Sequence, residues 1–219
     1  MSTPTSTPAQ LARAFLHCTL HSIIPLTRSG VEAGSKVFGA AVLKRTEKGG
    51  LTTVTVGTNT ETENPLLHGE ITTINQFYVL PKDKRPEAKD TIFFATHEPC
   101  SLCLSGITWG GWKEFYYLFT YEDTRDAFSI PYDIDILESV FRVPSSCAHE
   151  SPSDLAARPL YNRANKFFTS SSVGELIAKV EDEEERKELE ELVVQVKKEY
   201  EGLSEGYQKD KGNKGIPLA

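Results

Sequence analysis

Apolar residues recur along the first half of the chain with two spacings, one typical of helices and one typical of strands. The expected elements are, in order, a helix over residues 9–24, strands over 37–43 and 51–57 joined by a Gly-Gly turn, a helix over 69–80, a strand over 91–96, a helix from the cysteines near residue 100 to residue 109, and a strand over 115–120. Pro25 is expected to end the first helix, because a proline inside a helix removes a hydrogen bond and clashes with the preceding turn. Strands that alternate with helices predict an α/β fold whose sheet is covered on both faces.

The second half of the chain has a weaker pattern. Residues 134–143 fit either a helix or a strand, and residues 145–153 form a polar loop that contains Cys147 and His149. Loops of this length are often lids or disordered segments. The pattern becomes clear again over residues 173–205, where it predicts a charged amphipathic helix. A surface helix packed on its own domain is favoured over a dimer-forming helix.

These patterns divide the chain into a few parts. We expect a mobile tail over residues 1–8, one domain over 9–168, the amphipathic helix, and a loose tail over 206–219. Within the domain, residues 122–165 are a candidate for a segment that closes a pocket. A length of 219 residues is enough for one domain with a sizeable core and an appendage.

Composition and charge narrow the classes of function. The chain has 24 basic and 31 acidic residues, a net charge of −7, which argues against a protein that grips a nucleic-acid backbone. A small, neutral or weakly charged substrate fits better, although folding could still gather a local basic surface. We expect no signal peptide and no membrane helix, since no apolar run approaches the roughly 18 residues that a span needs. The cysteine usage fits a reducing, cytoplasmic location.

Two short motifs contain the candidate metal-binding and catalytic residues. His68 is followed two residues later by Glu70, and Pro99 precedes Cys100 and Cys103. One imidazole and two thiolates make a three-ligand zinc site, which leaves the fourth tetrahedral position to water, as in catalytic zinc sites. The order H-x-E and then P-C-x-x-C is the signature of the zinc deaminases. We therefore expect one Zn²⁺ per chain.

The spacing explains how these side chains would work. Cys100 and Cys103 are three residues apart at a helix start, so they share one face, and the helix dipole favours their thiolates. Glu70 is expected to be the catalytic residue that carries protons to and from the zinc-activated water. A closed structural site remains a minor alternative, in which His97 would be the fourth ligand. We favour His97 as a residue of the pocket or its surroundings.

Residues 9–123 resemble the cytidine deaminase-like superfamily. The stretch from Leu67 to Ile71 resembles fungal cytosine deaminases, and the stretch from Thr96 to Cys100 resembles tRNA adenosine deaminases and guanine deaminases. The resemblance implies a three-layer α/β/α sandwich with a mixed sheet of about five strands, followed here by a C-terminal helical extension. It also implies a homodimer. The substrate-binding residues that it implies are Phe38 and Gly39 in the pocket strand, Asn59, His97 and Glu98.

The function expected from the motif and the resemblance is hydrolytic deamination. A nucleobase or nucleoside, of the cytosine or cytidine type, would react with water and release ammonia. The alternatives are a guanine, guanosine or pterin-type substrate, a polynucleotide such as tRNA, and a deaminase-like partner subunit without activity. The intact Glu70 argues against the last alternative.

Overall fold

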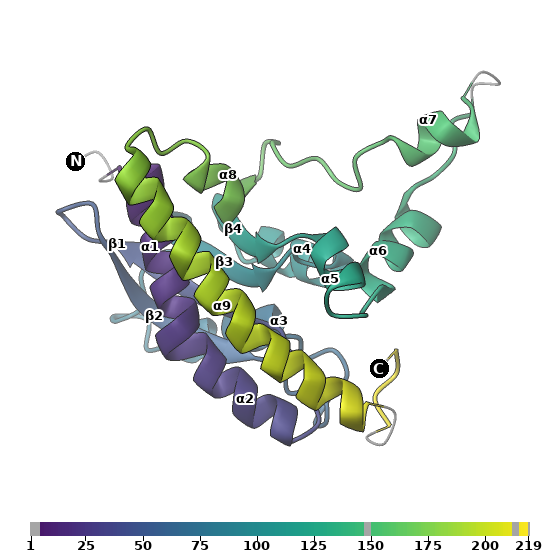
Figure 1. The fold of residues 1–219 in the computed structure, drawn as a ribbon, viewed down its shortest axis with the longest axis horizontal. Helices are drawn as coiled ribbons and strands as arrows, with labels where there is room; N and C mark the ends of the chain where they lie inside the picture. The colour runs from purple at the N-terminus through teal and green to yellow at the C-terminus, as the bar shows by residue number, and fades with distance from the viewer. Residues whose placement is uncertain (1–4, 147–149, 212–214, 219) are drawn as a thin grey trace.

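The computed structural model describes residues 5–146, 150–211 and 215–218, and its centre is one five-stranded sheet (Figure 1). The strand order is β2-β1-β3-β4-β5, in which β1 runs antiparallel to β2 and β3, whereas β3, β4 and β5 are parallel. The expected mixed α/β/α sheet is therefore confirmed. The strands are β1 Gly39–Arg45, β2 Leu51–Thr58, β3 Thr91–His97, β4 Glu114–Phe119 and β5 Thr169–Ser172.

Alternating side chains of the buried strands feed two separate cores, which makes the fold three layers thick. Ile92 and Phe94 of β3 join the core under α1 Pro8–Cys18 and α9 Glu183–Asp210, the two helices that lie side by side over one face (Figure 1). Phe93, between them in sequence, points to the other core, with α3 Gly69–Val79 and α4 Ser101–Trp109. This follows from the two-residue period of a strand.

The first helical segment continues beyond Pro25, so the expected end near residue 24 is wrong. A π-helical turn, η1 Thr19–Ile23, joins α1 directly to α2 Ile24–Glu32. The N–H of Ile24 bonds to the carbonyl of Thr19, five residues back. Pro25 stands in the first turn of α2, where its missing N–H is tolerated. The wider turn therefore accommodates the proline without breaking the helical path.

The expected single helix over 173–205 is instead two helices, which follow a short strand. Residues 169–172 form β5 beside β4, α8 Val173–Ile177 follows, and α9 begins only after a break. β5 is a run of one threonine and three serines, too short and polar to show a strand pattern. α9 also continues five residues beyond residue 205, and Tyr207 and Ile216 in the expected loose tail are buried.

The N-terminal stretch is tied to the domain within its described part. Ser6 donates a hydrogen bond to the carbonyl of Gly49, and Thr7 caps α1 by accepting from the N–H of Gln10. Residues 1–4, 212–214 and 219 lie outside the described residues, as do the predicted loop residues Cys147 and His149.

The segment that the sequence left open is helical. It contains α5 Tyr121–Asp126, α6 Tyr132–Ile136, the π-helical turn η3 Leu137–Phe141 and α7 Pro152–Ala156. Elsewhere in the chain, a short helical turn, η2 Ala88–Asp90, precedes β3. Of the two alternatives for residues 134–143, the helix is correct. Figure 1 shows α7 standing away from the body of the protein, joined to α8 by an extended chain. Among the described residues, no helix is both long and apolar enough to cross a membrane.

Candidate metal centre and its pocket

Three predicted zinc ligands meet at the starts of two helices. His68 is the N-cap of α3 and Cys100 is the N-cap of α4, while Cys103 lies in the first turn of α4. The Nδ1 atom of His68 lies 3.5 Å from Sγ of Cys100 and 3.7 Å from Sγ of Cys103. One ligand atom from each residue lies within 4.8 Å of the other two. The expected convergence of two helix starts is what brings them together.

The donor set and its charge fit zinc. One imidazole nitrogen and two sulfurs are ligands that zinc accepts with tetrahedral geometry, and three protein ligands leave a position for water. The hydrogen bond with Cys103 holds the pKa of the Cys100 thiol well below its usual value, and His68 acts in the same direction. Burial lowers the pKa of His68, but Cys100, Glu70 and Glu61 outweigh it and raise that pKa to about 9. The ring therefore lies in a negative field that favours a cation.

Glu70 lies beside these ligands in the first turn of α3 and is buried. Loss of solvent and the nearby Cys100 charge together raise its pKa to about 7, against the smaller lowering effects of His68 and of a hydrogen bond with Cys103. A carboxyl group with a pKa near neutrality can both take and give a proton at physiological pH. The structure thus places the predicted proton carrier next to the predicted metal site.

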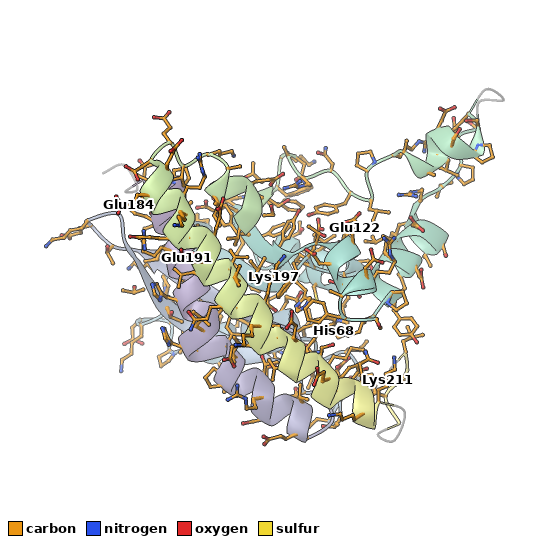
Figure 2. The ribbon with its side chains drawn as sticks, viewed as in Figure 1. His68, Glu122, Glu184, Glu191, Lys197 and Lys211 are labelled. Carbon is orange, nitrogen blue, oxygen red and sulfur yellow. The ribbon has the colours of Figure 1, made fainter. Side chains whose placement is uncertain are left out.

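A cavity of about 240 Å³ opens beside the ligands. Its walls come from the loop before β1, the loop before α3, the start of α4, α6 and the C-terminal tail. The lining residues are Lys36, Phe38, Glu61, Pro65, Leu66, His68, Cys100, Ser101, Leu102, Ile130, Tyr132, Asp133, Ile136, Pro217 and Leu218. In Figure 2 His68 lies near the middle of the molecule, whereas Glu184 and Glu191 stand out from α9. Cys100 and Cys103 are buried, and His68 is half-buried.

Of the two residues predicted to lie in the pocket strand, Phe38 lines the cavity, and Gly39 packs against the start of α3. Gly39 passes so close to the start of α3 that a Cβ on Gly69 would lie 2.8 Å from the Cα of Gly39. The backbone N–H of Gly39 also donates to Oγ1 of Thr96 on the neighbouring strand. Two glycines in contact allow α3, which begins right after His68, to pack directly on the sheet.

Asn59 is fully buried behind the cavity, where both ends of its amide bind the protein. Its Nδ2 donates to Glu61 at 2.8 Å, and its Oδ1 accepts from the N–H of Gly69. Asn59 therefore holds the start of α3 and the carboxylate of Glu61 in place. A direct contact between Asn59 and a substrate stays a prediction.

His97 and Glu98 point into different surroundings. His97 is enclosed by Phe38, Phe119 and two other aromatic rings, and burial lowers its pKa to about 3, so it stays neutral. His97 is not among the residues that line the metal cavity, but its ring contacts Phe38, which is. Glu98 accepts a hydrogen bond from the Tyr161 hydroxyl at 2.8 Å and lines a separate, arginine-rimmed cavity. Substrate contacts by either residue stay predictions.

Sequence reasoning missed three charged residues that line the metal cavity. Glu61 is buried, and its Oε1 lies 4.0 Å from Nε2 of His68. Lys36 forms an ion pair with Glu61, and Asp133 belongs to α6 in the stretch without a clear pattern. Burial raises the pKa of Asp133 to about 8, with Cys100 and Glu70 acting in the same direction. The only signal in the sequence was the position of Glu61 two residues after Asn59.

Comparisons with known proteins agree with this arrangement. Residues 19–119 match the family described as the cytidine and deoxycytidylate deaminase zinc-binding region. A search of curated proteins finds no match.

Similar solved structures belong to deaminases of several kinds. Guanine deaminase from Bacillus subtilis is 26% identical, with 59% of this chain and 78% of that chain covered and a TM-score of 0.46. Guanine deaminase from Nitrosomonas europaea is 19% identical, with 78% and 81% covered and a TM-score of 0.42. A structure from work on tRNA:A34 deaminases is 18% identical, with 78% and 96% covered and a TM-score of 0.40. These low scores do not identify a substrate.

The family match and the site coincide on the same part of the chain. The matched residues 19–119 contain His68, Cys100, Cys103 and Glu70. The three ligands converge as a zinc site requires, and the fold is the mixed five-stranded sandwich expected of the family. Residues 19–119 therefore match the cytidine and deoxycytidylate deaminase zinc-binding region, and the three convergent ligands lie within that match.

Proposed function

We propose that this protein is a zinc-dependent hydrolase that removes an exocyclic amino group from a nucleobase or nucleoside. The observation that carries the proposal is the placement of buried Glu70 beside three convergent ligands, at a cavity that a small ring can enter. A closed structural zinc site would have a fourth protein ligand and no use for a buried carboxyl group in this position. Among the described residues, the cluster contains His68, Cys100 and Cys103 only.

The protein residues would divide the work as follows. His68, Cys100 and Cys103 would hold zinc, which supplies an activated water when bound. Glu70 takes a proton from that water and delivers it to a ring nitrogen. It would then take the second proton from the added hydroxyl group and deliver it to the amino group as the carbon–nitrogen bond breaks. One water is consumed, ammonia leaves, and a carbonyl replaces the amino group.

A free base or nucleoside fits the cavity better than a polynucleotide. Small-molecule pockets commonly measure about 300–1,000 Å³, and a cavity of about 240 Å³ lies just below that range. The net charge of −7 also favours a substrate without a long phosphate backbone. The His68-Gly69-Glu70 motif favours a ring of the cytosine or cytidine type. Guanine, guanosine and pterins are the alternatives that the test includes.

The test is ammonia release by purified protein of measured zinc content. The panel contains cytosine, cytidine, deoxycytidine, CMP, adenine, adenosine, guanine, guanosine and a pterin. Glu70→Gln is the control, and it should retain zinc and lose nearly all turnover. Normal turnover in this variant would contradict the role of Glu70. If the zinc-loaded protein released no ammonia from any member of the panel, the proposed substrate class would be contradicted.

Two further expectations accompany the proposal. A homodimer, as the resemblance implies, would be tested by analytical ultracentrifugation of the zinc-loaded protein. A cytoplasmic location would be tested by fractionation of cells that express the full chain.

A further inference from the structure

A buried ion pair forms part of the wall of the metal cavity. Nζ of Lys36 lies 2.8 Å from Oε1 of Glu61, and the backbone N–H of Lys36 donates to Oε2 of the same carboxylate at 3.0 Å. The side chains are 8% and 1% exposed, and both residues line the cavity. Two contacts to one carboxylate hold the Lys36 ammonium at a fixed place in the wall.

A buried ion pair of this kind contributes little net stability to a fold. Removing two charges from water costs several kcal/mol per ion before their attraction is counted, and well-packed apolar residues often do as well. Glu61 lies beside the ligand His68, but the Lys36 charge is not one of the three convergent ligands. A cavity wall is where a fixed charge has another use, because it can face a ligand.

The Lys36 ammonium has hydrogen-bonding capacity left for such a ligand. An ammonium has three N–H donors, and the hydrogen bond to Glu61 uses one of them. The Glu61 oxygen that Nζ of Lys36 contacts also lies 4.0 Å from Nε2 of His68, so the ammonium is on the same side of the cavity as this ligand.

A carboxyl group from another part of the chain completes the polar wall. Asp133 of α6 lines the same cavity, and the Lys36 charge lies close enough to act on the Asp133 carboxyl. Ionised or protonated, a carboxyl group keeps at least one acceptor oxygen. The rest of the wall includes apolar side chains, among them Phe38, Leu66 and Ile130. A flat ring would thus meet one fixed cationic donor and one acceptor.

We propose that Lys36 and Asp133 select amino-substituted rings that carry a carbonyl group next to a ring N–H. The Lys36 ammonium would donate to the carbonyl oxygen, and Asp133 would accept from the ring N–H. Cytosine, guanine and pterins have this pair of groups, whereas adenine has no carbonyl. The inference rests on the proposed deaminase function and narrows its substrate class. A site whose buried donor stays unpaired rejects such an analogue strongly.

Binding to the zinc-loaded Glu70→Gln protein tests the inference without turnover. Two matched pairs of ligands differ in the carbonyl group and the ring N–H next to it: cytosine with 4-aminopyrimidine, and guanine with 2-aminopurine. Isothermal titration calorimetry should show one carbonyl-bearing ring binding at least tenfold more tightly than its partner, as expected for a charged hydrogen bond. Lys36→Met should bring the two affinities within threefold of each other, and Asp133→Leu, which removes the acceptor, should weaken binding of the carbonyl-bearing ring.

Controls separate recognition from folding. Lys36→Met leaves Glu61 buried without its partner, so Lys36→Met/Glu61→Gln is made as well, and both are checked by thermal unfolding and zinc content. Lys84→Met, at an exposed lysine, should leave the affinity ratio unchanged.

The outcomes distinguish the two proposals. Ammonia release together with an affinity ratio that Lys36→Met does not change would overturn this inference and leave the deaminase intact. Tight binding of 4-aminopyrimidine or 2-aminopurine would do the same. A zinc-loaded protein that binds no ring and releases no ammonia would overturn the proposed function, and this inference with it.

Discussion

Oε1 of Glu61 lies 4.0 Å from Nε2 of His68, on the opposite side of the ring from the nitrogen that faces Cys100 and Cys103. A carboxylate placed behind a ligating histidine orients the ring and increases its basicity, and its loss typically weakens metal binding by about 10–100-fold. We therefore expect Glu61→Ala to weaken zinc binding by at least about tenfold, measured by competition with a chromogenic chelator.

Two further variants sharpen this prediction. Glu61→Gln keeps an acceptor oxygen and should lose less affinity than Glu61→Ala. Glu63→Ala removes an exposed carboxylate from the same loop and should bind zinc like the unaltered protein. Equal zinc affinities in Glu61→Ala and Glu63→Ala would show that Glu61 does not support His68.

Zinc removal should affect catalysis and stability separately. A strong chelator is expected to abolish ammonia release and to lower the thermal midpoint of unfolding, because an ion that binds only the folded state stabilises that state. Added zinc should restore both. Glu70→Gln should show the same zinc-dependent midpoint while remaining inactive, because the variant keeps all three ligands. A midpoint that does not respond to zinc would contradict binding at this site.

Gly69 should tolerate no larger residue. A Cβ at Gly69 would lie 2.8 Å from Cα and 3.0 Å from N of Gly39, and 2.9 Å from the carbonyl oxygen of Phe38. These are backbone atoms and cannot rotate away. We expect Gly69→Ala to lower the free energy of unfolding by about 1–3 kcal/mol, measured by urea denaturation.

A matched glycine in open space provides the control. A Cβ at Gly202, in α9, would meet no atom within 4 Å. Gly202→Ala should therefore stabilise the protein by up to about 1 kcal/mol through helix propensity. Similar effects of the two substitutions would rule out the close packing of α3 on β1 as the cause.

His97 should make the protein less stable in acid. Burial lowers its folded-state pKa to about 3 from an ordinary value of 6.5. Above pH 6.5 the ring is neutral in both states, but below it the unfolded chain takes up a proton that the folded protein excludes. Stability should therefore fall as the pH decreases from 6.5 towards 3, with a contribution of at most about 1.4 kcal/mol per pH unit.

Substitution isolates this contribution. His97→Phe replaces the ring with one of similar shape in an aromatic site, and it should make the plot of unfolding free energy against pH less steep between pH 6 and 4. His17→Phe, at an exposed position, should leave the slope unchanged. Parallel profiles for unaltered protein and His97→Phe would argue against a buried neutral His97.

Tyr200 should anchor α9 to the strand that leads to the metal centre. It is fully buried, and its ring centre lies 5.6 Å from that of His97 and 5.1 Å from that of Phe119. Tyr200→Ala is expected to cost about 3–5 kcal/mol, as for other buried aromatic rings. Val194→Ala, at a residue of the same helix that is 67% exposed, should change stability little. Equal melting curves for the two variants would show that α9 contributes no core.

The candidate zinc ligands, the candidate proton carrier and the order of the first elements could be predicted from the sequence alone. These features depend on local patterns: His68 and Glu70 are two residues apart, Cys100 and Cys103 are three apart, and β3 contains the apolar run from Ile92 to Ala95. The periodicity of α3 and α4 likewise follows from neighbouring residues. Patterns of this kind can be recognised before folding is considered, because each depends only on residues that are close in sequence.

Only the tertiary structure decided what surrounds the site. Lys36, Glu61 and Asp133 come from three segments with no shared pattern, and folding brings them to one cavity. β5 is a strand because β4 offers it an edge, since its four hydroxyl-bearing residues have no apolar face of their own. Pairing partners and cavity walls depend on contacts between distant residues, and a linear pattern does not encode them locally.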